Sequence, residues 1–358
     1  MKKLSWLFLF LLFSLTSCFG IQEVVLDTDD DLHVLNTSKS TYLLEEALTH
    51  HCEKGPIDTV HLFGYYRAAL DMDFTEGDED LGYDFNSINA GINGKFKNGK
   101  TRYEARLRFN PQHDYSFMQY LPSNIYVAHS VNPNNTLVVG HTRTPVGYEG
   151  GMSMTYLPFV ARSQIGRNFG NVRKMGVRLK GNYDYVEYDL GGYSSDTYFQ
   201  KFFPGVEFSG WVTLKPLGEK EEKYGKIRVA GGLTSGKNDI DYTVSGVYAG
   251  YEYKKFSADF EYAYADGYNG AKKITSDKAE GFNATLGYKI TPKLQVVARY
   301  DQYVPNRNLK ADIRREYSAG LNYFIKEQTL KLMLNYVFCQ NDMKDDSHRI
   351  ILGTQILL

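Results

Sequence analysis

Charged side chains at every second position are the pattern in this chain with the clearest chemical meaning. In Thr101–Phe109, Arg102, Glu104, Arg106 and Arg108 alternate with Tyr, Ala, Leu and Phe. Successive side chains of a β-strand point to opposite faces, so these four charges would share one face and the apolar groups the other. A row of cations on a wet surface attracts and steers anions, and a carboxylate among them can also neutralise its neighbours. The pattern therefore predicts a strand between water and an apolar phase.

Catalytic chemistry has weaker support. His129, Ser130 and His141 are the nearest approach to a hydrolase constellation, which needs a nucleophile, a base and an orienting group within hydrogen-bonding reach. His129 would lie near a turn and His141 most of a strand away, so the geometry is poor. The adjacent residues His50, His51 and Cys52 would rarely point at one metal ion. The sequence predicts no catalytic residue, metal site or cofactor.

The elements that position these charges are strands, because apolar/polar alternation restarts about sixteen times between Ile57 and Leu358. A soluble sandwich would offer about seven to nine strands per domain. Sixteen strands predict an all-β fold, namely a transmembrane antiparallel up-and-down β-barrel with lipid outside and water inside. The count could be off by two, since the fifth, eighth and tenth strands alternate less cleanly. The predicted cores are 59–71, 86–97, 101–109, 123–131, 135–143, 172–180, 183–191, 206–215, 225–233, 240–251, 256–265, 280–290, 293–303, 315–325, 329–338 and 348–358.

The connections between these strands alternate in length. Short ones include Asn98-Gly99, a favoured hairpin dipeptide. The long ones are residues 75–81, 110–121, 146–171, 194–206, 266–278, 304–314 and 340–347. This alternation is expected when short turns lie on the periplasmic side and long loops outside, with both chain ends in the periplasm.

Residues Met1–Gly20 have the form of a signal peptide, with two lysines before an apolar run. Cleavage after Gly20 is the favoured expectation, and a lipobox ending at Cys18 is the alternative. Residues 21–56 would form a polar periplasmic segment, with a short helix capped by Thr41 and running through Leu48. Residues 57–358 would form the barrel.

The composition fits a barrel wall. The chain has 29 Tyr and 21 Phe, whose rings suit the two membrane–water interfaces. Its mean hydropathy is −0.41, which a wall with one wet face explains. A net charge of −1 gives no basis for binding nucleic acid, so membrane lipid and small polar solutes are the expected partners.

Strand parity assigns charged residues to the channel. The inward acids include Glu187, Asp189, Asp259, Glu261 and Asp301. The predicted pore-lining cations are Arg67, Arg102, Arg106, Arg108, Lys174, Arg178, Arg228 and Arg299. A basic inward set predicts a preference for anions. The alternative is that these charges only satisfy each other in pairs.

The longest connection, residues 146–171, is rich in glycine and apolar residues and needs a surface to pack on. We expect it to fold into the barrel and narrow the channel, with Arg143, Arg162 and Arg167 as constriction residues. An external cap or a subunit-interface loop remains the alternative.

Two passages give the chain a family resemblance. Val138–Glu149 contains G-x-x-x-x-P-x-G-x-E and resembles a segment of the phosphate-selective porin O and P family. Arg299–Asn306, followed by Ser318–Tyr323, is similar to a later part of that family. The resemblance implies a sixteen-stranded, usually trimeric, outer-membrane porin whose third long loop, here Pro145–Asn171, folds inward. The family's arginine ladder and lysine cluster for phosphate have no assigned counterpart here.

The sequence thus predicts a water-filled channel in the bacterial outer membrane for passive diffusion of small hydrophilic solutes, with a preference for anions. Phosphate as a solute is implied by the resemblance alone. A structural or adhesive barrel without an open channel is the main alternative, and a barrel hydrolase is a weaker one.

Overall fold

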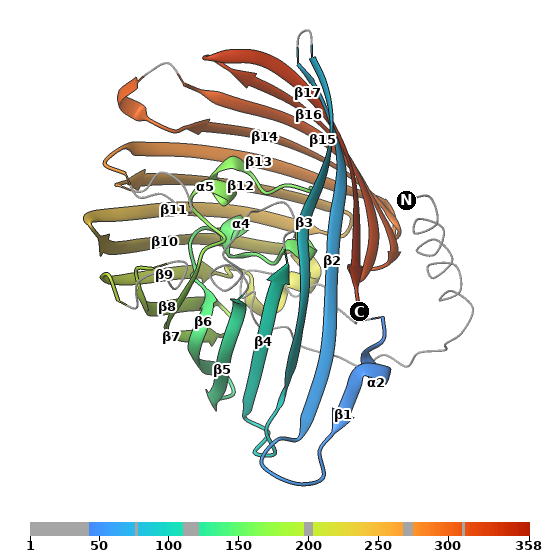
Figure 1. Ribbon diagram of the computed structural model, residues 1–358, viewed down its shortest axis with the longest axis vertical. Helices are drawn as coiled ribbons and strands as arrows, with labels where there is room; N and C mark the ends of the chain where they lie inside the picture. The colour runs from blue at the N-terminus through green and yellow to red at the C-terminus, as the bar shows by residue number, and fades with distance from the viewer. Residues whose placement is uncertain (1–42, 76–77, 110–121, 197–202, 268–274, 310–311) are drawn as a thin grey trace.

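The computed structural model describes residues 43–358, apart from residues 76–77, 110–121, 197–202, 268–274 and 310–311 (Figure 1). The expected signal peptide, the Cys18 lipobox and the predicted cap Thr41 lie outside the described residues. None of the helices in the described part is long and apolar enough to cross a bilayer.

Sixteen strands pair in chain order, each antiparallel to the next, and the last pairs with the first. Leu352 lies opposite Leu70 at this closure. The strands are β2 (Thr59–Thr75), β3 (Asp78–Lys95), β4 (Thr101–Phe109), β5 (Pro122–Asn132), β6 (Asn135–Arg143), β7 (Arg173–Asn182), β8 (Val186–Ser194), β9 (Val206–Leu214), β10 (Lys226–Asn238), β11 (Ile240–Tyr253), β12 (Phe256–Asp266), β13 (Lys278–Thr291), β14 (Leu294–Val304), β15 (Arg314–Lys326), β16 (Leu330–Asn341) and β17 (Lys344–Leu357). The predicted closed antiparallel barrel of about sixteen strands is confirmed.

Each predicted core overlaps one of these strands, but several strands run further than predicted. The predicted connections 75–81 and 340–347 are wrong, because β2 and β3 are separated only by residues 76–77 and β16 and β17 by residues 342–343. Beyond the apolar band both faces of a strand meet water, so the alternation that marks a strand is lost there. Hydrogen bonding between neighbouring strands continues nevertheless.

The two faces of the sheet differ as the sequence predicts. On β16, Leu334 is 44% exposed on the outer face, whereas the next residue, Asn335, is 1% exposed on the inner face. An exposed apolar face around a buried polar one is the reverse of a soluble protein, and it is the arrangement that a hydrocarbon environment favours.

Aromatic side chains form a continuous row across the outer face of five consecutive strands, β12 to β16. Neighbouring ring centroids lie 5.0–6.0 Å apart along Phe260, Phe282, Tyr300, Tyr317 and Phe338. Such rings combine apolar area with polar edges, which suits the boundary between lipid and water.

The part of the N-terminal segment that the structure describes is attached to the barrel. Helix α2 covers only Glu45–Leu48, and strand β1 (Thr49–His51) pairs with β2. Over the described residues, α2 is therefore shorter than the helix predicted from the sequence. Three other short helices lie in connections between strands: η2 (Gly218–Lys220), α6 (Glu221–Tyr224) and η3 (Arg307–Leu309).

The connection between β6 and β7, residues 144–172, is called the long connection below. It contains α4 (Tyr148–Gly151), η1 (Met154–Tyr156) and α5 (Gln164–Asn168). In Figure 1 these green helices lie within the curve of the sheet. Ile165 and Phe169 of α5 pack in a buried cluster with Tyr242, Ala263 and Tyr303 of the wall.

Candidate channel lining

Inner-face cations hold the backbone of the long connection. Arg67 of β2 donates hydrogen bonds to the carbonyl oxygens of Met154 and Phe159, the latter at 2.6 Å. Lys331 of β16 donates to the carbonyls of Thr155 and Leu157 at 2.9 and 3.2 Å. Irregular backbone removed from water needs such partners, so these two cations stabilise the connection.

Neutral side chains add to this anchoring. Asn335 of β16 accepts a hydrogen bond from the Val160 amide at 2.8 Å, and Asn322 of β15 donates to the Pro158 carbonyl at 2.9 Å. Both asparagines are almost completely buried. Sequence reasoning did not select them, although their inward parity was readable, because their partners lie more than 150 residues away.

Wall carboxylates accept hydrogen bonds from the first turns of the two α-helices. Glu261 of β12 accepts from the amides of Tyr148 and Glu149 at 2.6 and 3.1 Å, where α4 begins. Asp301 of β14 accepts from the Gln164 amide at 2.6 Å, where α5 begins. The first amides of a helix have no partner within the helix, and a carboxylate there satisfies them.

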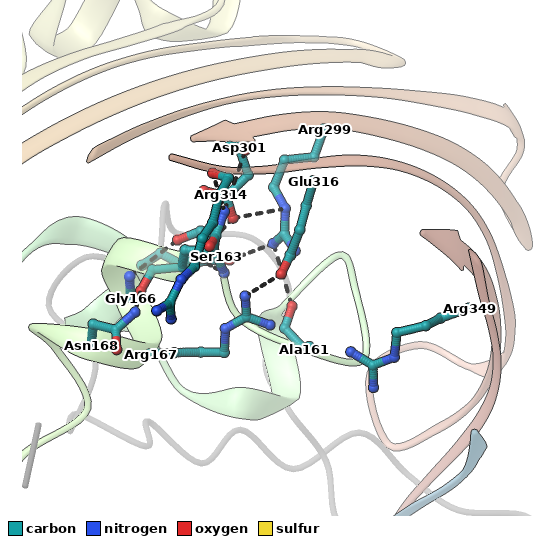
Figure 2. A network of polar contacts seen from close by, with 12 residues as sticks. Ala161, Ser163, Gly166, Arg167, Asn168, Arg299, Asp301, Arg314, Glu316 and Arg349 are labelled. Atoms are coloured by element: carbon teal, nitrogen blue, oxygen red, sulfur yellow. Dashed lines mark hydrogen bonds and ion pairs between the residues drawn. The ribbon is translucent and has the colours of Figure 1, made fainter. Parts of the chain in front are cut away.

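An ionic network links α5 to β14 and β15 (Figure 2). Arg167 and Glu316 are 2.6 Å apart. Arg299 donates to the Ala161 carbonyl at 3.3 Å and lies 3.4 Å from Glu149. The network therefore joins both ends of the long connection to the wall.

Two glycines allow the long connection to fold back on itself. A Cβ at Gly150 would lie 2.7 Å from the Cα of Gly170, and a Cβ at Gly170 would lie 2.3 Å from the Cα of Gly150. Real side chains do not approach so closely, so the contact between α4 and the end of α5 requires glycine at both positions.

Three of the predicted pore-lining cations are buried in ion pairs. Their partners are carboxylates: Lys174 pairs with Glu207, Arg178 with Asp189 and Arg228 with Glu221. Asp189 was expected on this face, whereas Glu207 and Glu221 were not selected from the sequence. Arg67 and Arg299 contact the long connection instead, as described above.

The predicted arginines of β4 differ from this group because Arg102, Arg106 and Arg108 are each partly exposed. Glu104 lies 2.6 Å from Arg106, which is the pairing expected from their spacing, and it also accepts from Asn124 at 3.2 Å. The strand thus carries three guanidinium groups and one carboxylate at alternate positions.

The predicted constriction arginines occupy two places. Arg143 and Arg162 come together at α4, where both are buried and donate to backbone carbonyls, Arg143 to Gly151 and Arg162 to Glu149 and Met152. Arg167 of α5 pairs with Glu316, and its side chain is 34% exposed. Arg143 and Arg162 therefore maintain the shape of the connection.

The residues considered for catalysis are separated. His129 contacts Thr101 at 2.8 Å and His141 contacts the Ser123 carbonyl at 2.9 Å. Ser130 lies opposite Thr136 in the sheet register, and His141 lies opposite Ile125. The described residues bring no histidine of this group to the serine in a nucleophile–base arrangement.

Comparison with known proteins supports the same fold. The family model "Phosphate-selective porin O and P" matches residues 207–350, a range that contains the second of the two passages noted in the sequence, Arg299–Asn306 followed by Ser318–Tyr323. No curated protein sequence matches the chain.

Solved structures share the architecture at low identity. The outer membrane channel DcaP of Acinetobacter baumannii aligns over 86% of this chain and 99% of its own, with 14% identity and a TM-score of 0.61. An anion-selective porin from Comamonas acidovorans aligns over 84% and 99%, with 12% identity and a TM-score of 0.62. Outer-membrane OmpT of Vibrio cholerae aligns over 86% and 100%, with 14% identity and a TM-score of 0.58. The predicted resemblance to the phosphate-selective porin O and P family is thus confirmed by a match over residues 207–350, and the fold is one shared with outer-membrane porins.

Proposed function

We propose that the protein is a porin of the bacterial outer membrane, a water-filled channel through which small hydrophilic solutes diffuse passively. One observation carries the proposal: a closed barrel of sixteen strands exposes apolar side chains outward and encloses polar ones. Barrels of this strand number have room for an aqueous channel.

We also propose that the long connection narrows this channel and that the remaining opening prefers anions. Its hydrogen bonds to Arg67, Lys331, Asn335 and Glu261 support a fixed position against the inner face. The arginines of β4 support the anion preference, because Arg102, Arg106 and Arg108 are all partly exposed on one strand. The deeply buried pairs contribute less to selectivity, since each cation already has a carboxylate partner.

Assembly as a homotrimer in the outer-membrane lipid completes the proposal. It rests on the resemblance to a usually trimeric family. The broad apolar outer face would serve equally against lipid or a neighbouring subunit.

A structural or adhesive barrel with a closed lumen is the second candidate. The long connection is the observation that favours it, because Leu157 and Phe159 at its centre are fully buried and polar residues of β2, β15 and β16 hydrogen-bond to its backbone.

Liposome swelling separates the two candidates. Vesicles reconstituted with the purified protein and loaded with an impermeant polymer should swell when placed in isosmotic pentose, and swell more slowly in larger oligosaccharides. Protein-free vesicles provide the baseline. Swelling at the baseline rate with correctly folded, inserted protein would remove the channel and leave the structural barrel.

A further inference from the structure

A cavity of about 560 Å³ lies between the long connection and the ends of β11 to β16. Tyr148, Met152 and Tyr156 line it from the long connection. The facing side is formed by three hairpin turns, those joining β11 to β12, β13 to β14 and β15 to β16, and by the strand ends next to them. Its volume lies in the range of about 300–1,000 Å³ that is usual for sites of small molecules. All three turns are short, and short turns are expected on the periplasmic side.

Lysines gather along the turn side of this cavity. Lys254, Lys255, Lys289 and Lys293 are exposed, and Lys326 is partly exposed. The backbone amide of Lys289 donates to the Lys255 carbonyl at 2.8 Å, which fixes two of the strand ends side by side. Among the described residues none of the five forms an ion pair. Their positive charge is therefore available to a solute.

The carboxylates that line the same cavity neutralise this charge only in part. Glu252 lies 4.0 Å from Lys226, and Asp259 accepts a hydrogen bond from Tyr248. Glu327 is exposed in the β15–β16 turn. Cations outnumber carboxylates, so the cavity favours an anion.

Apolar groups form the opposite side of the cavity. On the long connection Leu157 is buried, and Met152, Tyr156 and Pro158 are partly exposed beside it; Phe324 of β15 adds a buried ring from the wall. A small inorganic anion would gain no affinity from these apolar side chains, because every part of the anion needs a polar partner. An organic anion could place its charged group at the lysines and a ring against these side chains, and burial of the ring adds to its affinity.

We propose that this cavity is a binding site for an organic anion that carries a compact apolar or aromatic group, at the turn end of the channel. That this anion permeates the channel rests on the proposed function. Its binding to the cavity can be measured even on protein that forms no open channel.

The experiment uses 4-fluorobenzoate and the full-length protein in detergent, with ¹⁹F line broadening as the measure of binding. The test variant carries K254Q, K255Q, K289Q and K293Q. The matched control carries K97Q, K100Q, K220Q and K223Q, which remove the same charge from other short turns. We expect the probe to bind the wild type and the control alike. The test variant should bind about tenfold more weakly, because several partly screened charges are lost.

Competition separates the apolar contribution from simple charge attraction. Benzoate should displace the probe at a concentration about tenfold lower than acetate or inorganic phosphate, because only benzoate buries a ring. Equal competition by phosphate, equal binding by the test variant, or no binding to the wild type would each overturn the site. Absence of liposome swelling alongside normal binding would refute the proposed function and leave the site standing.

Discussion

Replacing both neutral anchors of the long connection, in the variant N322L/N335L, should loosen it without changing any charge. Asn335 accepts from the Val160 amide at 2.8 Å and Asn322 donates to the Pro158 carbonyl at 2.9 Å. Leucine is close to asparagine in size and removes both bonds. Since the lumen keeps its charges, the selectivity should stay as it is.

The magnitude follows from the burial of these groups. Depriving a buried polar group of its partner costs about 1–3 kcal/mol, so the two bonds together amount to about 2–6 kcal/mol. A difference of 1.4 kcal/mol is tenfold in an equilibrium, so local release of residues 157–160 should become more frequent by at least about 30-fold. The other anchors, Arg67 and Lys331 among them, should keep the rest of the connection in place.

Single-channel recording measures this release as current fluctuation. The variant should show more frequent transient steps and a higher mean conductance, with an unchanged reversal potential in a salt gradient. N283L is the matched control, because Asn283 is also buried on the inner face but, among the described residues, forms no hydrogen bond with the long connection. Current traces that match the wild type in step frequency and conductance would refute the role given to these bonds.

Three further changes test other parts of the structure. R102Q/R106Q/R108Q should move the reversal potential toward cation selectivity, because it removes the partly exposed positive charge of β4; an unmoved potential would place the selectivity elsewhere. Gly170→Ala should raise conductance in planar bilayers, since its Cβ would lie 2.3 Å from backbone and displace the long connection; an unaltered conductance would show that the contact is dispensable. Leu334→Arg should lower the heat-resistant folded fraction on electrophoresis, because an arginine facing lipid near the midplane costs about 2–4 kcal/mol. Wild-type folding of that variant would contradict the assignment of the outer face.

The strands could be predicted because the membrane imposes a local rule. Along Leu330–Phe338 each residue faces either hydrocarbon or water, so apolar and polar residues alternate along the strand with a period of two. The outer ends of β2, β3, β16 and β17 were not predicted, because side chains need not alternate beyond the edge of the apolar band. Backbone hydrogen bonds between the strands continue there, although the side-chain types no longer alternate.

The candidate site was less accessible to sequence reasoning. Parity assigned Arg67 and Arg299 to the inner face but gave no partners for them, and in the structure both donate hydrogen bonds to the long connection. Their contacts with the long connection join residues far apart in the chain, and such contacts depend on how the connection packs. The pairing of Arg106 with Glu104 was readable because both lie on one strand.

The central claim is that the closed barrel contains an open aqueous path, and a planar-bilayer recording of the purified protein tests it most directly. The account predicts stable ohmic current steps and, in a salt gradient, a reversal potential of anion sign. Bilayers that stay silent after insertion of folded protein would contradict the channel itself. A potential of cation sign would contradict the selectivity assigned to its arginines.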